Sequence, residues 1–334
     1  MFAELLKDKV IIRNKKEASR IYNKGFYGKF NNILELNLIE ACYLLEKEKI
    51  EILLNKKRMN LNEFMEYSLK YMQDFEIKYL VYRDLRERGY IVKINNDFYL
   101  YERGKKPPEK PAFNVKAFSE RVKFNIKEIE ELIKKAKKLL VGIVDEEGDI
   151  TYYIVKFFRM KGKLEEREYE GEIILLNDRC IVWDEKLANK LKDDFIGRDF
   201  GKYVQLSLME AAYLATKGAK IIRNDVEISI EEFIEYAKKI QPDIEKRLKA
   251  YIDLRKLKLL PKTGYKFGSH FRVYDEMPKK THAPYLIHVV DENYEATWAE
   301  ISRAIRLAHS VKKEMIFCKV NKEIGYIRLK RVTP

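Results

Sequence analysis

The spacing of apolar residues predicts the same series of short elements twice along the chain. Apolar residues cluster over 4–12 in a pattern typical of a short hairpin, and a similar cluster returns over 174–182. A segment with helical spacing of apolar residues then follows, over 38–44 in the first half and 208–214 in the second. The offset between matched segments stays at about 170 residues, as an internal duplication requires. The sequence therefore predicts two copies of one plan.

Further matched segments support the duplication and suggest its register. The pairs are 26–30 with 199–203, 62–67 with 231–236, and 82–86 with 251–255. Within each copy, helical patterns come first and strand patterns dominate later. We therefore expect an α+β fold of two tandem repeats, each a small helical α/β subdomain followed by a mixed sheet with flanking helices.

A charged, weakly apolar stretch separates the two copies. Residues 161–168 read Lys-Gly-Lys-Leu-Glu-Glu-Arg-Glu, which is typical of a linker. We place the first repeat at 1–160, the linker at 161–170 and the second repeat at 171–334. The mixed-sheet subdomain of the second repeat is expected to begin at about residue 262.

Composition indicates a globular protein with a polyanionic partner. The 334 residues are 46% hydrophobic and 36% charged, which suits a soluble chain with a well-buried core. The formal net charge of +14 favours an RNA or DNA partner, although basic proteins without such partners exist. No apolar run is long enough to span a bilayer and no signal peptide precedes the first charges, so we expect a cytoplasmic protein with no membrane partner.

The cysteines give no sign of metal binding or of disulfides. Cys42, Cys180 and Cys318 lie far apart in apolar surroundings, so we expect three buried thiols. No cofactor and no metal site are predicted.

Three segments of the second copy carry chemistry. Tyr274 ends an aromatic-rich strand, His282 follows after a turn containing Met277-Pro278-Lys279-Lys280, and Lys313 lies where a predicted helix meets a new strand. A phenol, an imidazole and an ammonium could converge from these segments. Such a trio suits cleavage of RNA by its own 2′-hydroxyl, which needs a base, an acid and a cation for the phosphate.

At these residues the sequence resembles the archaeal tRNA-splicing endonuclease family, in its homodimeric form with two tandem repeats per chain. The resemblance rests on Gly-Tyr-Lys-Phe-Gly at 264–268, Phe-Arg-Val-Tyr at 271–274, His-Ala-Pro-Tyr-Leu at 282–286 and Ser-Val-Lys-Lys at 310–313. It implies that Tyr274 is the general base, His282 the general acid and Lys313 the cation that stabilises the transition state. Lys313 is preferred to Lys312 because the family places the catalytic lysine last. His270 departs from the pattern, since the family commonly has an acidic residue there.

The same resemblance implies the reaction and the fold of the mixed-sheet unit, which is nuclease-like. The family excises introns from precursor tRNA by cutting both splice sites at a bulge-helix-bulge junction. The expected products carry a 2′,3′-cyclic phosphate and a 5′-hydroxyl, and the reaction needs no metal.

Only the second copy holds the full set of catalytic groups. The first copy retains Tyr101 and Lys138 at matching positions, but residues 106–111, Lys-Pro-Pro-Glu-Lys-Pro, stand opposite His282. All four histidines of the chain lie in the second copy: His270, His282, His288 and His309. We therefore expect one active site per chain, with His270 as an alternative acid.

The resemblance also implies contacts with RNA and with a second chain. Arg306 and Arg328 match an arginine pair that clamps a bulged base, and Lys266 and Arg272 could contact phosphates. The acidic turn at Asp145, Glu146, Glu147 and Asp149 would dock into a basic pocket of the partner's catalytic unit, giving a homodimer with two active sites. Exposed surface arginines and a solvated turn are the alternatives.

Two other functions compete with this one. The chain could be a non-catalytic RNA-binding or structural subunit, against which the complete trio argues. It could also be a metal-dependent DNA nuclease, since Asp243, Glu245 and Lys246 resemble a carboxylate-lysine motif. Those two carboxylates lie too close together in a helical, charged stretch, and a solvated helix face explains them better.

Overall fold

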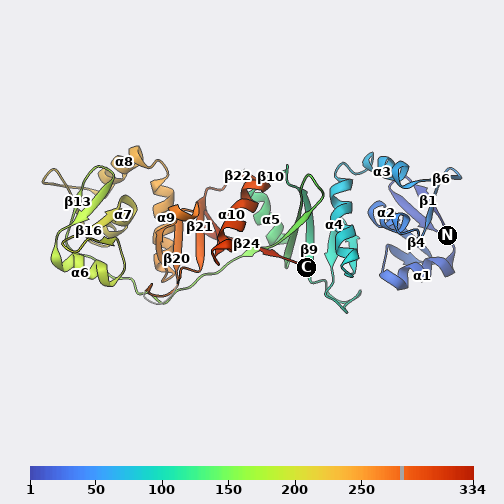
Figure 1. Cartoon of the computed structure of the whole chain (residues 1–334), viewed down its shortest axis with the longest axis horizontal. Coiled ribbons are helices and arrows are strands. Elements are labelled where there is room, and N and C mark those ends of the chain that lie inside the picture. Colours follow the sequence, from blue (N-terminus) through green and yellow to red (C-terminus); the bar gives the residue numbers. More distant parts are fainter. Residues whose placement is uncertain (279–281) are drawn as a thin grey trace.

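The computed structural model describes residues 1–278 and 282–334. The molecule is elongated, with a small subdomain at each end and a long sheet through the middle (Figure 1). The N-terminus lies in one end subdomain, whereas the C-terminus lies near the centre. None of the described helices is long and apolar enough to pass through a lipid bilayer.

The end subdomain of the first copy is a twisted sheet of short strands packed against three helices. Its sheet has the order β3-β4-β2-β1-β5-β6, with β1 and β5 parallel. The elements are β1 (Phe2–Leu6), β2 (Lys9–Ile12), α1 (Lys15–Gly25), β3 (Lys29–Asn31), β4 (Ile33–Asn37), α2 (Leu38–Glu46), β5 (Glu51–Leu54), β6 (Lys57–Met59) and α3 (Leu61–Leu69).

The end subdomain of the second copy repeats this arrangement. Its sheet has the order β15-β16-β14-β13-β17-β18, with β13 and β17 parallel. The elements are β13 (Glu172–Leu175), β14 (Arg179–Val182), α6 (Glu185–Asp193), β15 (Arg198–Asp199), β16 (Val204–Ser207), α7 (Leu208–Ala215), β17 (Lys220–Arg223), β18 (Val226–Ile228) and α8 (Ile230–Ile240).

The buried helix of each end subdomain begins with the same local signal. Asn37 before α2 and Ser207 before α7 accept hydrogen bonds from backbone N–H groups of the first turn. Glu40 and Glu210, three residues further on, accept from the backbone N–H of the cap residue, which completes a capping box. The sequence thus fixes the start of both helices.

The remaining elements of both copies form one ten-stranded sheet. Its order is β19-β20-β21-β23-β24-β12-β11-β9-β8-β7. The first copy supplies α4 (Phe75–Glu87), β7 (Val92–Asn95), β8 (Asp97–Leu100), β9 (Phe113–Ser119), α5 (Ile126–Lys135), β11 (Leu139–Val144) and β12 (Ile150–Phe157). The second supplies α9 (Ile244–Lys256), β19 (Leu260–Thr263), the 3₁₀ turn η1 (Tyr265–Phe267), β20 (Phe271–Tyr274), β21 (Tyr285–Val290), α10 (Trp298–Ser310), β23 (Glu314–Val320) and β24 (Ile324–Val332).

Antiparallel pairing of β12 with β24 joins the two copies, with Val155 opposite Leu329. The central helices α5 and α10 share a core with both halves of the sheet, which includes Trp298 and Phe317 of the second copy and Tyr153 of the first. A small ribbon of β10 (Lys123–Asn125) and β22 (Glu295–Thr297) pairs beside these helices. Burial of large apolar side chains from both copies makes this junction a continuous core.

The expected fold class, a mixed α/β architecture in two tandem repeats, is confirmed. The end subdomains hold more strand than the sequence pattern indicated, because strands of so few residues show too little alternation to be recognised.

One matched segment was predicted in the wrong register. Residues 26–30 do not correspond to 199–203 but to the segment that begins at Phe195. Gly28 and Gly197 both have positive φ, 60° and 73°, and each donates its N–H to the glutamate of the following buried helix. The similar residues at 199–203 instead cover the end of β15 and the turn that leads into β16. Similarity in composition carries little structural information in such a turn.

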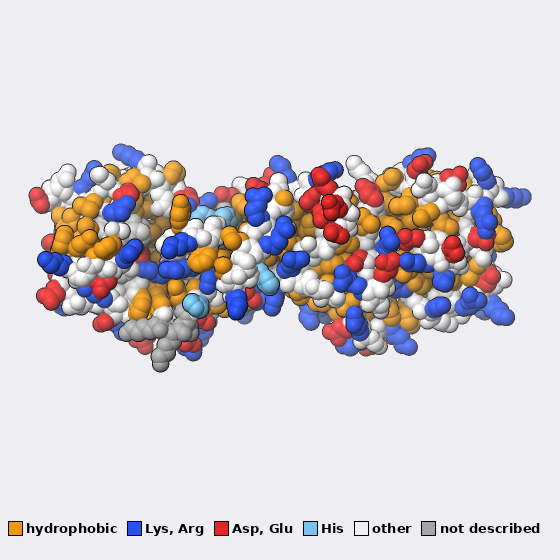
Figure 2. Space-filling model, viewed as in Figure 1, with side chains coloured by type: hydrophobic (Ala, Val, Ile, Leu, Met, Phe, Trp, Pro, Cys, Tyr) orange, Lys and Arg blue, Asp and Glu red, His pale blue; other side chains and the backbone are white. Residues whose placement is uncertain are grey.

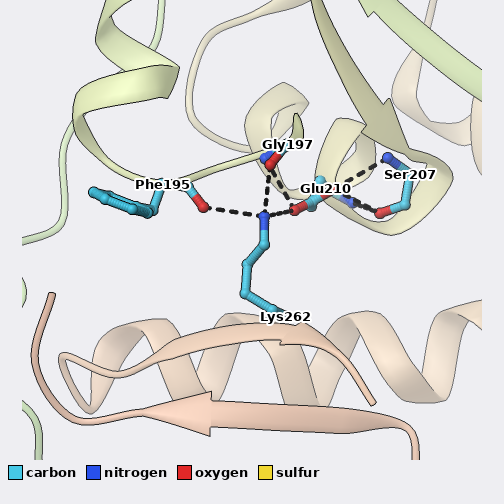
Figure 3. A network of polar contacts seen from close by, with 5 residues as sticks. All are labelled: Phe195, Gly197, Ser207, Glu210 and Lys262. Atoms are coloured by element: carbon cyan, nitrogen blue, oxygen red, sulfur yellow. Dashed lines mark hydrogen bonds and ion pairs between the residues drawn. The ribbon is translucent and has the colours of Figure 1, made fainter. Parts of the chain in front are cut away.

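A partly buried lysine ties each end subdomain to the central sheet. In the second copy, Lys262 on β19 donates from its ammonium to the carbonyl oxygens of Phe195 at 3.0 Å and Gly197 at 2.8 Å. It also pairs with the carboxylate of Glu210 at 2.9 Å, and Glu210 accepts from the backbone of Ser207 (Figure 3). We refer to Lys262 and Glu210 with these carbonyls as the second-copy latch.

The first copy has the corresponding latch. Lys93 on β7 donates to the carbonyl oxygens of Phe26, at 2.8 Å, and Gly28. Glu40 accepts from the N–H of Gly28 at 2.9 Å. Because the first copy lacks the histidine, the shared latch is a feature of the fold rather than of the chemistry.

We expect acid to act on the two latch glutamates in opposite directions. Burial raises the pKa of Glu40 despite the Gly28 hydrogen bond and the Lys93 charge. Burial also acts to raise the pKa of Glu210, but the charge and hydrogen bond of Lys262 hold that pKa below its ordinary value. The contribution of Glu40 to folding stability is therefore lost as the pH rises from the ordinary glutamate pKa through the raised pKa of Glu40. The contribution of Glu210 is lost as the pH falls from the ordinary glutamate pKa through the lowered pKa of Glu210.

Urea unfolding of Glu40→Gln and Glu210→Gln at pH 4 and pH 7 checks this contrast. Glu210→Gln is expected to be more destabilising at pH 7 than at pH 4, and Glu40→Gln more destabilising at pH 4 than at pH 7. Parallel pH dependence of the two variants would contradict the assignment.

Candidate active site

Strand β20, which lies next to the edge strand β19, places Arg272 and Tyr274 on one face of the sheet. Phe271 and Val273, which alternate with them, are buried in the core of the second copy. The guanidinium carbon of Arg272 lies 5.8 Å from the centre of the Tyr274 ring. The buried Nε of Arg272 has no hydrogen-bond partner within residues 1–278 and 282–334, although Arg272 lines a pocket.

Lys313 reaches toward the segment that carries His282. Helix α10 ends at Ser310, and the chain turns through Lys312, which has a positive φ of 55° and an exposed side chain. The half-buried Lys313 then donates from its ammonium to the carbonyl oxygen of Ala283 at 2.6 Å. The geometry favours the sequence choice of Lys313 over Lys312.

The charge of Lys313 is held close to that of Arg272. Burial lowers the pKa of Lys313, and the guanidinium of Arg272 lowers it further. The Lys313 ammonium also lies 5.6 Å from the centre of the Phe267 ring, in the turn before β20. Lys313 thus links the turn before β20, the strand itself and the segment before β21.

His282 is exposed and directly precedes the buried Ala283 at the start of the segment leading into β21. Of the turn expected before it, Lys279 and Lys280 lie outside the described residues. The structure therefore brings the backbone beside His282 to Lys313, and Lys313 to Arg272 and Tyr274.

A pocket opens between the end subdomain of the second copy and the edge of the sheet. Its volume is about 340 Å³, and its lining includes Lys192, Lys262, Arg272, Tyr274 and Asp199. Blue side chains gather near β20 on the face shown in Figure 2. Lys192 pairs with Asp199 at 3.0 Å and Lys262 with Glu210 at 2.9 Å, so Arg272 is the cation of this lining best placed for an anionic group.

The other three histidines do not share these surroundings. His270 accepts a hydrogen bond at Nδ1 from the backbone N–H of Val289 at 2.8 Å, and its ring lies 4.5 Å from that of His288. Burial, followed by the neighbouring His288, lowers the pKa of His270 to about 3. A neutral, buried imidazole at neutral pH is a poor alternative acid. His309 is exposed on α10.

The predicted RNA-binding residues are distributed unevenly. Lys266 is exposed in η1 and Arg306 is exposed on α10. Arg328 is instead mostly buried: its side chain is 16% exposed, and it donates to the carboxylate of Glu314 at 2.8 Å. Its guanidinium lies over the ring of Phe158, at 4.5 Å.

Phe158 and the latch were missed in the sequence. Phe158 follows the last strand of the first copy, yet its ring packs edge-on against Tyr285 of the second at 5.6 Å. No local pattern indicates such a contact. Lys262 and Glu210 could have been found, because the first copy has Lys93 and Glu40 at matching positions.

The matching region of the first copy is apolar. Burial raises the pKa of Tyr101, which lies in a pocket of about 340 Å³ with Phe113, Leu140 and Ile154. The Lys138 ammonium lies 5.9 Å from the centre of the Phe113 ring. This pocket is therefore largely apolar near Tyr101, with Glu102 and Arg103 as charged residues of its lining.

The acidic turn between β11 and β12 is exposed and locally ordered. The carboxylate of Asp145 accepts from the N–H groups of Glu147 and Asp149 at 3.0 and 2.9 Å, and Glu146 pairs with Arg121 at 2.7 Å. Figure 2 shows a dense red group in the middle of this face, where Figure 1 places the tip of the green hairpin.

The carboxylate-lysine motif forms ordinary ion pairs. Asp243 accepts from Nε of Arg247 at 2.6 Å, and Glu245 pairs with Lys238 at 2.9 Å. Both acids begin α9, where carboxylates complement the helix dipole. The geometry agrees with a solvated helix face.

Comparison with known proteins accounts for nearly the whole chain. The model of the tRNA intron endonuclease catalytic C-terminal domain matches residues 75–152 and 244–326. The model of the tRNA intron endonuclease N-terminal domain matches residues 1–65 and 171–234. Both domains therefore occur twice.

Several relatives are similar over their full lengths. A tRNA-splicing endonuclease of Methanococcoides burtonii is 38% identical over 99% of both chains, and one of Haloferax volcanii is 29% identical over 98% of this chain and 99% of that protein. One of Thermococcus onnurineus is 34% identical over 46% of this chain and 93% of its own length. The last relative is therefore about as long as one copy.

Proposed function

Because the chain belongs to the tRNA intron endonuclease family, whose members excise introns from precursor tRNA, we propose that its second copy cuts both splice sites at a bulge-helix-bulge junction by metal-independent transesterification. In this reaction the 2′-hydroxyl of the RNA attacks the adjacent phosphate. Tyr274 accepts the proton of that hydroxyl, and His282 donates a proton to the departing 5′-oxygen. The products are a 2′,3′-cyclic phosphate and a 5′-hydroxyl.

Lys313 and Arg272 stabilise the negative charge that develops on the phosphorus oxygens. Fixed cations placed before the reaction contribute more than mobile ions in water, because they need not reorganise. The observation that carries the proposal is the hydrogen bond from Lys313 to the carbonyl of Ala283, next to His282, while Arg272 links Lys313 to Tyr274. Lys313 in this way meets two segments that precede it by about 30 to 40 residues.

Cleavage in EDTA tests the reaction. We expect purified protein to cut an intron-containing precursor tRNA twice in about 5 mM EDTA, which removes contaminating metal. The rate should be about the same as in Mg²⁺ with the same folded RNA. End analysis should give cyclic phosphate and 5′-hydroxyl termini. A requirement for divalent metal, or 5′-phosphate ends, would refute the proposal, and bound but uncut RNA would favour the non-catalytic subunit.

Arg306 and Arg328 form the proposed clamp for a bulged base. Arg306 is exposed on the surface of α10, whereas Glu314 and Phe158 hold Arg328 from two sides. A held guanidinium offers a fixed plane for stacking, and an exposed one can close on the other side of the base. Lys266 and Arg272 add phosphate contacts.

We further propose a homodimer in which the acidic turn of each first copy docks against basic side chains of the partner's second copy, outside the pocket of Tyr274. The turn presents Asp145, Glu146, Glu147 and Asp149, and the second copy carries exposed lysine and arginine side chains. Opposite charges on the two surfaces favour this pairing. In the proposed division, residues 1–160 bridge the dimer, 161–170 link the repeats and 171–334 carry catalysis.

Charge reversal in the turn tests the dimer. Glu147→Lys with Asp149→Lys leaves the Asp145 carboxylate that orders the turn, and it is expected to weaken dimerisation by about 10- to 100-fold. Sedimentation velocity should show the 80 kDa pair, twice the 39.9 kDa chain, shift toward the single chain. Glu323→Lys, in the matching turn of the second copy, is the control. Unchanged mass for the double variant would exclude this docking.

A further inference from the structure

The turn between β19 and β20 carries a strongly exposed aromatic ring. Tyr265 is 89% exposed, more than any other large hydrophobic side chain among the described residues. Asn96 alone joins the corresponding strands β7 and β8 of the first copy, whereas residues 264–270 join β19 and β20. Tyr265 therefore lies in an extension that only the second copy possesses.

This extension is rigid, although its most prominent ring is exposed. The N–H of Phe267 donates to the carbonyl of Gly264 at 2.8 Å, and the N–H of Gly268 donates to the carbonyl of Tyr265 at 3.1 Å. Ser269 is buried, and the partly buried imidazole of His270 closes the segment by accepting from the backbone of β21. A fixed backbone lowers the entropic cost of holding a ligand against Tyr265.

The extension also belongs to the surroundings of the candidate active site. Phe267, two residues after Tyr265, lies beneath the Lys313 ammonium. Lys266 between them is an exposed basic residue. An aromatic plane next to basic side chains is the usual platform for an unpaired base and its phosphate.

We propose that Tyr265 is a base-stacking residue that holds an unpaired nucleotide of the RNA beside the cut phosphate. This inference rests on the proposed function, since it takes the RNA of that reaction as the ligand. Tyr265 acts in substrate binding and not in proton transfer. The chain's net charge of +14 and the neighbouring Lys266 favour RNA over an apolar protein surface as the occupant.

Binding of an uncleavable RNA tests the proposal. The probe is a bulge-helix-bulge RNA with 2′-deoxynucleotides at both cut positions, which removes the nucleophile but keeps the unpaired bases. Tyr265→Ala is expected to weaken binding by about 5- to 150-fold, as loss of one stacked base predicts, while Tyr265→Trp retains it. Phe2→Ala, which removes a 64% exposed ring from the first copy, is the matched control.

Fluorescence then locates the stacked base. With 2-aminopurine at each unpaired position in turn, one position should be quenched by wild type and by Tyr265→Trp but not by Tyr265→Ala. Equal affinity of Tyr265→Ala and wild type, or a change in oligomeric mass without a change in stacking, would overturn the assignment. Wild-type protein that fails to cut the corresponding all-ribose RNA would instead overturn the proposed function.

Discussion

His282→Ala is expected to slow cleavage at both splice junctions by about 10²- to 10⁴-fold, which is the usual contribution of a general acid. Without the imidazole, the 5′-oxygen must leave as an alkoxide or wait for a proton from water. Single-turnover cleavage of precursor tRNA with saturating enzyme measures this chemical step. His309→Ala, which removes another exposed histidine of the second copy, should leave the rate within about 2-fold of wild type.

A better leaving group separates proton donation from other roles of His282. In a substrate with sulfur in place of the bridging 5′-oxygen, the departing thiolate needs little protonation, because a thiol has a far lower pKa than an alcohol. This substrate should restore most of the rate of His282→Ala but not that of Lys313→Ala. If sulfur substitution rescues neither variant, His282 is not the acid.

Lys262→Met is expected to lower the free energy of unfolding by about 3–5 kcal/mol, because it leaves the Glu210 carboxylate buried without its charge partner. The side chains of Lys262 and Glu210 are only 17% and 12% exposed. Urea unfolding at pH 7 measures the loss. Lys220→Met breaks the exposed pair with Glu227, of similar length at 2.9 Å, and should cost less than about 1 kcal/mol.

Removing both charges of the latch tests the cause. Lys262→Met combined with Glu210→Gln should be less destabilised than Lys262→Met alone, since no buried charge is then left unpaired. Two additive losses would show that the lysine acts through packing of its aliphatic chain rather than through the charge.

The duplication was visible in the sequence because each copy repeats strong local signals. The capping boxes at Asn37–Glu40 and Ser207–Glu210 begin the same buried helix, and such signals depend on neighbouring residues only. The register at 26–30 failed for the converse reason. There the decisive feature is a glycine backbone bound by a lysine from a distant strand, and a segment of five residues does not reveal such a contact.

The candidate site divides in the same way. Tyr274, His282 and Lys313 could be predicted as a catalytic set because each lies in a recognisable sequence motif, and their roles stay a prediction. The burial of Arg328 could not, since its partners Glu314 and Phe158 come from two other segments, one of them in the first copy. The pairing of β12 with β24 that brings Phe158 there also depends on long-range packing.

The ten-stranded sheet sets the distance between the acidic turn and Tyr274 in each chain. The acidic turn extends from β11, and Tyr274 lies on β20, five strands away in the sheet order. With neighbouring strands about 4.8 Å apart, this spacing is roughly 24 Å, and backbone hydrogen bonds hold it constant. In the proposed dimer, the spacing of the strands therefore sets the interval between the two cuts, whatever the nucleotide sequence of the intron.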